Sequence, residues 1–123
     1  MGLAKENGMV WIKGEKRDVD HPEPGFYALR LVRKGPEVAS TIECVDGVWR
    51  ATINGEPDGE DNIDPQIASG VQRVWLWGRY IPESEYRYLL ARHRHAVEHD
   101  PTSPYANPEK PIDLRAIPVI GGK

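Results

Sequence analysis

The stretch that decides the fold is EVASTIECVDGVWRATIN, residues 37–54, in which an Asp-Gly pair stands between two alternating runs. Asp46-Gly47 favours a two-residue hairpin turn, because both turn positions adopt a positive φ that Asp and Gly tolerate. The stretch therefore predicts an antiparallel hairpin of residues 37–44 and 48–54. Its more apolar faces are expected to carry Val38, Ser40, Ile42 and Cys44 on the first strand, and Trp49, Ala51 and Ile53 on the second.

Three further strands are expected around this hairpin. Residues 25–33 alternate, with Tyr27, Leu29 and Leu31 on one face. Residues 9–12 form a short apolar run typical of an edge strand, and residues 71–77 form a run rich in apolar and aromatic side chains that also predicts a strand. The segments 14–24 and 55–70 are polar, and we expect them to be loops.

One helix is expected from Pro82 to about His99. Proline suits the first turn of a helix because its missing N–H needs no partner there, and Pro101 stops the helix. Glu83 and Glu85 complement the positive end of the helix dipole. At 100° per residue, the expected buried face carries Tyr86, Leu89, Leu90, His93, Ala96 and Val97, and the far side carries Tyr88, Arg92, His95 and His99.

These elements predict an α+β fold. The expected architecture is a twisted antiparallel sheet of four to five strands, with one C-terminal helix packed on one face and an irregular proline-rich tail from residue 100. The tail is expected to wrap over the sheet and helix. The absence of a repeat or second core in the sequence predicts a single domain over residues 1–123, with 1–8 and 120–123 flexible. The tail's expected anchors are Ile112, Leu114, Ile117 and Val119.

Composition excludes several classes of protein. The chain has 123 residues, 16 basic and 19 acidic, for a formal net charge of −3, which gives no general attraction to nucleic acid. A single cysteine, Cys44, excludes an internal disulfide and a zinc site built from cysteine pairs, and fits a reducing cytoplasm. No apolar run approaches the roughly 20 residues that span a bilayer, so we expect no membrane partner.

Candidate catalytic and metal-binding groups are sparse. His95 and His99 have the i, i+4 spacing that can hold a metal ion, but the His-Glu-x-x-His pattern is absent and we expect a solvated face. His93 lies among apolar neighbours, and a structural hydrogen bond is the simpler interpretation than a catalytic base. The acidic loop 58–69 fails the calcium pattern, since it lacks the required glycine and final glutamate. We therefore expect no cofactor, no metal and no catalytic residue.

A basic and aromatic surface is the main candidate for binding. Trp75 and Trp77 would share one face of the strand predicted at 71–77, either as core anchors or as an exposed platform for a partner. Arginines follow closely and could meet an acidic protein or phosphates, or pair with nearby glutamates. The hypothesised contact surface comprises Trp75, Trp77, Arg79, Tyr88, Arg92 and His95.

Three segments carry a resemblance. The stretch PGFYALRLVRKGP at 24–36, IPESEYRYLL at 81–90 and NPEKPIDL at 107–114 resemble small uncharacterised proteins of bacteriophages and proteobacterial prophages. The Ile-Pro-Glu-Ser helix start departs from the Ile-Ser-Glu-Ala form of that group, replacing a side-chain cap with a proline. The resemblance implies a phage or prophage origin and a bacterial host cytoplasm, and it implies no activity.

The function expected from the sequence is that of a phage or prophage accessory protein that binds a macromolecular partner without catalysis. A protein partner is favoured over nucleic acid. Two alternatives stay open: a nucleic-acid-associated protein that uses the arginine and aromatic surface, and a small metal- or histidine-dependent enzyme.

Overall fold

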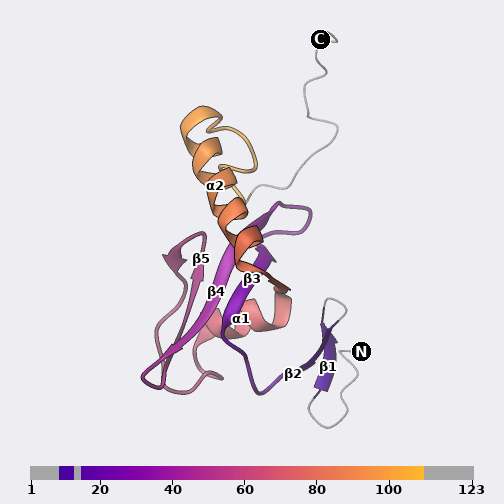
Figure 1. Cartoon of the computed structure of the whole chain (residues 1–123), viewed down its shortest axis with the longest axis vertical. Coiled ribbons are helices and arrows are strands. Elements are labelled where there is room, and N and C mark those ends of the chain that lie inside the picture. Colours follow the sequence, from indigo (N-terminus) through magenta and orange to yellow (C-terminus); the bar gives the residue numbers. More distant parts are fainter. Residues whose placement is uncertain (1–8, 13–14, 110–123) are drawn as a thin grey trace.

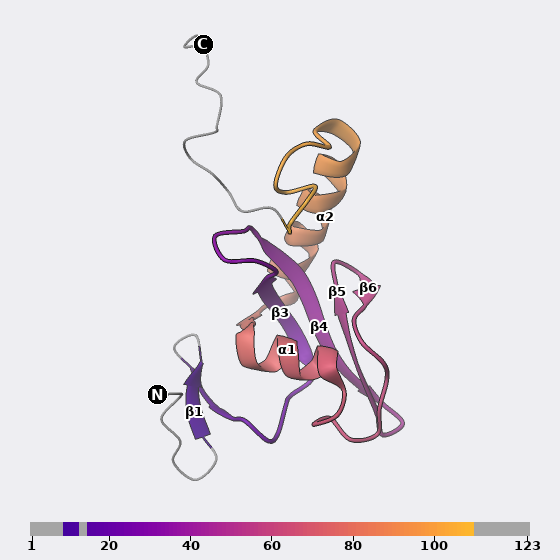
Figure 2. The same cartoon turned by 180° about the vertical axis from the view of Figure 1, so that it is seen from behind.

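The computed structural model describes residues 9–12 and 15–109. Within them the chain forms an α+β fold in which two helices lie on opposite faces of a five-stranded sheet (Figures 1 and 2). The flexible ends expected at 1–8 and 120–123, and the tail anchors expected beyond 110, lie outside the described residues. The elements are β1 (Met9–Ile12), β2 (Glu15–Asp18), β3 (Gly25–Arg30), β4 (Glu37–Val45), β5 (Val48–Ile53), β6 (Glu56–Pro57), α1 (Ser69–Trp77), β7 (Arg79–Ile81) and α2 (Glu83–His99).

The five-stranded sheet is antiparallel throughout, with strand order β6-β5-β4-β3-β7. The central hairpin confirms the prediction from Asp46-Gly47, because Val45 pairs with Val48 and the two turn residues have φ of 53° and 78°. Asn54 and Gly55, at φ 55° and 83°, make a second turn of the same kind and lead into β6. The expected α+β sheet with a C-terminal helix is confirmed.

Alternation along the strands divides the core into two parts. Tyr27 and Leu29 of β3 face α1, whereas Ala28 faces α2 together with Ala39 of β4, its partner in the ladder. The larger core, on the α1 side, contains Tyr27, Leu29, Val38, Ile42, Ala51, Ile53, Ala68, Val71, Val74 and Trp75. The smaller core, on the α2 side, contains Ala28, Ala39, Ile81 and Leu89.

The strand expected at 71–77 is wrong, because this segment forms helix α1. The buried residues of α1 are Gly70, Val71, Val74 and Trp75, which recur at helical spacing and face the sheet. The helix carries the chain across the sheet from the β6 edge to the β7 edge (Figure 2). It covers the sheet face that a single C-terminal helix would leave bare.

Helix α2 begins and ends as expected. Pro82 precedes its first residue, Glu83 and Glu85 lie in its first turn, and it ends at His99, two residues before Pro101. Leu89 and Ala96 are buried, but Val97 is 49% exposed although the wheel placed it on the buried face. The reason is that the C-terminal half of α2 extends beyond the end of the sheet (Figure 1).

The N-terminal strands form a separate two-stranded sheet. The edge strand expected at Met9–Ile12 is present, but it pairs with β2, in a region where a loop was expected. Arg17 of β2 connects this hairpin to the larger core: its side chain is buried and its Nη1 donates a hydrogen bond to the carbonyl of Trp75 at 2.7 Å.

Cys44 was expected on the more apolar face of its strand, but it is exposed because it lies near the end of β4, where burial stops and Val45 is exposed as well. Over the described ranges, no helix has the length and apolar character needed to cross a bilayer.

Candidate interaction surface

The six residues expected to form one contact surface lie on two sides of the sheet. Trp75 and Trp77 belong to α1, on one face, whereas Tyr88, Arg92 and His95 belong to α2, on the other. Arg79 lies on the edge strand β7 between the two helices. The six residues therefore do not form one continuous surface, and each has its own surroundings.

Trp75 is part of the core and cannot contact a partner. It is 4% exposed, and its indole Nε1 donates a hydrogen bond to the carbonyl of Asp18 at 2.8 Å. The guanidinium carbon of Arg17 lies 4.9 Å from the centre of its ring, and the Tyr27 ring meets it edge-on. The hypothesised exposed indole is thus wrong for Trp75, because helical geometry turns it away from Trp77.

Trp77 is the exposed member of the pair. Its side chain, at the C-terminal end of α1, is 65% exposed. It borders an open hollow of about 830 Å³ between α1 and the loop that follows β3. An exposed indole beside a concave surface is a feature of binding sites rather than of cores.

The hollow has a uniform charge. Among the described residues that line it, the ionisable ones are all cationic, and the others are apolar apart from the indole. Arg33 and Lys34 are exposed on the loop after β3, and Arg73 is exposed on α1, one turn before Trp77. We call this surface the Trp77 hollow; it consists of Leu29, Arg30, Leu31, Val32, Arg33, Lys34, Arg73 and Trp77.

Arg79 is held by two carboxylates. Its guanidinium donates to both oxygens of Glu37, at 3.2 and 2.9 Å, and to Glu85 at 2.6 Å. The hydrogen bonds that Arg79 donates to Glu37 and then to Glu85 raise the pKa of Arg79 above its ordinary value, so the cation persists at every pH the fold tolerates. Through its Nε and Nη2 groups this guanidinium ties β7, β4 and α2 together, so most of its donors are already used within the chain.

The Arg79→Ala variant is expected to lower the free energy of unfolding by about 0.5–1 kcal/mol, because the side chain is 40% exposed and solvent screens the pairs. Urea titration at pH 7 measures this change. Arg87→Ala removes a more exposed pair with Glu83 and should cost less. A loss above about 3 kcal/mol for Arg79→Ala would contradict the screened pair that the exposure implies.

Of the three α2 residues, Arg92 contacts β4 and the segment after α2, whereas Tyr88 and His95 are exposed. Arg92 was expected on the far side of the helix, but its Nη2 donates to the carbonyl of Glu37 at 2.9 Å, and its guanidinium carbon lies 4.4 Å from the Tyr105 ring centre. Tyr88 is 60% exposed, 5.8 Å from the same guanidinium. His95 is exposed near the C-terminal end of the helix.

The histidines of α2 have two different surroundings in the part of the chain that is described. The rings of His95 and His99 lie 4.5 Å apart, centre to centre, yet no group of three side chains that could hold a metal ion occurs among residues 9–12 and 15–109. A catalytic zinc site uses three protein ligands. His93 Nδ1 lies 2.9 Å from the carbonyl of Tyr105 and anchors the segment after α2, in line with a structural role.

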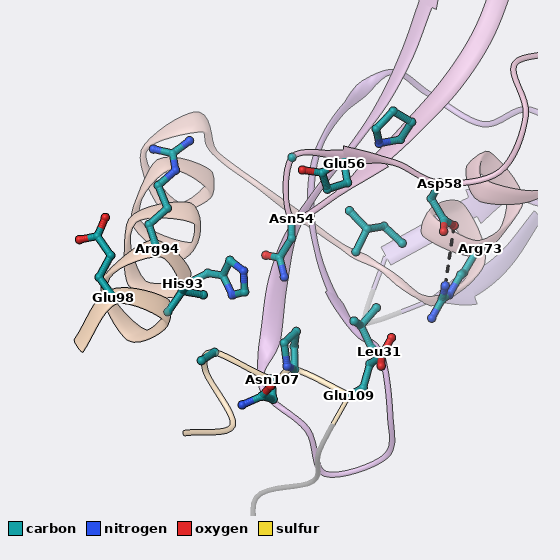
Figure 3. Close-up of a pocket in the computed structure, with 16 residues that line it drawn as sticks. Leu31, Asn54, Glu56, Asp58, Arg73, His93, Arg94, Glu98, Asn107 and Glu109 are labelled. Atoms are coloured by element: carbon teal, nitrogen blue, oxygen red, sulfur yellow. Dashed lines mark ion pairs between the residues drawn. The ribbon is translucent and has the colours of Figure 1, made fainter. Parts of the chain in front are cut away.

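A second hollow adjoins the first. It has a volume of about 850 Å³ and lies between the C-terminal half of α2, the turn after β5 and the segment 106–109 (Figure 3). Its rim mixes charges: Arg94 and Glu98 project from α2, and Arg73 pairs with Asp58 at 3.7 Å on the opposite side. Arg73 and Leu31 line both hollows. Mixed charge makes this second hollow a weaker candidate for selecting a partner.

Comparison with known proteins adds no further assignment: no family model, curated protein or solved structure matches the chain.

The residues that the sequence failed to group with Trp77 are Arg33 and Lys34, some forty positions earlier. A basic pair beside Gly35-Pro36 signals only an exposed turn, and nothing local indicates that this turn lies beside the end of α1.

Proposed function

We propose that this protein is an accessory protein of a phage or prophage, that it resides in the bacterial cytoplasm, and that it acts without catalysis by binding a macromolecular partner at the Trp77 hollow. The observation that carries the proposal is an indole 65% exposed beside a concave surface whose described ionisable residues are all cationic. The phage origin is supported by the three resembling segments at 24–36, 81–90 and 107–114.

Physical chemistry favours this surface over the rest of the molecule. Tryptophan and arginine are the residues that contribute most to binding when a partner covers them, since a rigid ring gives area and guanidinium gives directed hydrogen bonds. Trp77 has exposed ring area, whereas Arg79 and Arg92 already donate to groups of the same chain. The cations of the hollow select for an acidic or phosphate-bearing partner.

Capture from a bacterial host tests the proposal. The tagged full chain, Trp77→Ala and Tyr88→Ala are compared, and bound proteins and nucleic acids are both quantified. Tyr88 is the matched control, because it is similarly exposed and lies on the opposite face of the sheet. We expect at least one species to bind the parent chain and Tyr88→Ala and to fall at least about fivefold with Trp77→Ala.

An identical set of captured species for all three chains would overturn the proposed use of the Trp77 hollow. Loss of binding with Tyr88→Ala but not with Trp77→Ala would place the contact on α2 instead.

A further inference from the structure

We infer that the partner of the Trp77 hollow is a single strand of nucleic acid, with a base stacked on the Trp77 indole and neighbouring phosphates bound by Arg33, Lys34 and Arg73. This inference rests on the proposed function and names the chemistry of the partner.

The indole supplies the stacking surface. Trp77 is the last residue of α1, and much of its ring area is open to solvent. Leu31 and Val32, both partly buried, contribute apolar surface to the same hollow. Bases stack on such rings whatever their sequence, and only unpaired bases offer a free face to a side chain. A duplex keeps its bases stacked on one another, so the stacking surface favours single strands.

The cations supply the phosphate contacts. Arg33 and Lys34 are exposed, and neither forms an ion pair with another residue of the described ranges. Arg73 is 3.7 Å from Asp58, and the two side chains are 42% and 32% exposed. A screened pair at that distance is weak, so a phosphate can compete with the carboxylate for Arg73.

The composition of the hollow favours a nucleic acid over an acidic protein as the partner. The centre of a protein–protein interface is depleted of charge and contains several aromatic or apolar anchors. Here the aliphatic lining is buried or partly buried, and the exposed lining consists of a single indole and four cations, as in surfaces that bind single strands by stacking and phosphate attraction. The net charge of −3 gives the chain no general attraction for a polyanion, so binding depends on local cations such as these.

The sugar is not expected to matter. Recognition of RNA over DNA depends on the 2′-hydroxyl, which donates and accepts hydrogen bonds. The arginine and lysine donors of the hollow can bind a phosphate with or without a 2′-hydroxyl, and no side chain among the described lining residues carries an oxygen acceptor that would select for one. DNA and RNA strands of the same length should therefore bind alike.

Fluorescence anisotropy with labelled oligonucleotides tests the inference. The probes are 20-nucleotide oligo(dT), oligo(U), a 20-base-pair duplex and poly-glutamate of matched charge, each titrated with the full chain. We expect the two single strands to bind within about threefold of each other and several-fold tighter than the duplex or poly-glutamate. Three phosphate contacts predict a slope near −2 for log affinity against log salt, or about a 20-fold loss between 50 and 200 mM.

Matched variants assign the binding to the hollow. Trp77→Ala should weaken oligo(dT) binding at least about fivefold, whereas Tyr88→Ala should leave it unchanged. Arg73→Glu should weaken it by a similar factor, and Arg87→Glu, the same charge change on an exposed part of α2, should have a much smaller effect. Asp58→Asn should strengthen binding about two- to fivefold, because it removes the carboxylate that competes for Arg73.

The contrary outcomes are distinct. No binding of either single strand at 50 mM salt would overturn the inference, and so would poly-glutamate or duplex binding as tight as oligo(dT), or a Trp77→Ala variant with unchanged affinity. If the oligonucleotides fail but capture yields a protein that depends on Trp77, the inference fails and the proposed function stands. If neither depends on Trp77, both fail.

Discussion

The Trp75→Ala variant is expected to unfold with a free energy about 3–5 kcal/mol below that of the parent chain, which is the range for large aromatic side chains removed from a core. The substitution removes a side chain that is 4% exposed and packed between Tyr27 and Arg17. It also removes the indole donor to the Asp18 carbonyl, which connects the N-terminal hairpin to α1. Urea denaturation followed by circular dichroism measures the change.

Trp77→Ala is the matched control for this prediction. It deletes the same side chain two residues further along the same helix, where it is 65% exposed. We expect a change within about 0.5 kcal/mol, as for exposed positions in general. Equal losses for the two variants would contradict the helical assignment, since they are what a strand with both indoles on one buried face would give.

The error at residues 71–77 has a definite physical cause. Valine and tryptophan favour strands, and a seven-residue segment with five apolar members, ended by Gly78, is too short for periodicity to separate a strand from a buried helix. Val71, Val74 and Trp75 do have the i, i+3, i+4 spacing of a helix face, which Gly70 extends, but three positions are too few to outweigh the strand interpretation. Packing of this segment against the sheet outweighs the strand propensity of its residues, and the segment forms a helix.

The central hairpin could be predicted because its determinants are local. Asp46 and Gly47 occupy a turn that their own backbone preferences define, and strand alternation fixes which side chains face each helix. The C-terminal helix is likewise set by Pro82 and Pro101 on either side of it. Elements whose determinants lie within about twenty residues of one another could therefore be predicted from the sequence.

Only part of the candidate site could be predicted from the sequence, because tertiary contacts bring its residues together. Trp77 and Arg73 stand out in the sequence as an aromatic and a basic residue at helical spacing, once the helix is known. Arg33 and Lys34 join them only because β3 lies under α1. Arg79 and Arg92 illustrate the reverse case, since Glu37 lies more than forty positions away in the sequence and yet engages both.

The Gly70→Ala variant is expected to lose at least about 2 kcal/mol of unfolding free energy, although alanine is the better helix former by about 1 kcal/mol. A Cβ at this position would lie 1.9 Å from the carbonyl oxygen of Asp58 and 2.8 Å from its carbonyl carbon. That carbonyl belongs to backbone and has little freedom to retreat, since the amide of Asp58 donates to the Ala51 carbonyl at 2.9 Å. Either α1 or the loop after β6 must shift.

Ser69→Ala provides the control for this steric argument, because Ser69 is the exposed neighbour in the same helical turn. It should change the unfolding free energy by no more than about 0.5 kcal/mol. Both variants are compared by urea denaturation. A Gly70→Ala chain as stable as the parent would contradict the close approach of α1 to Asp58. Because Asp58 is the residue that pairs with Arg73, that result would also remove the geometric basis for the affinity gain expected of Asp58→Asn.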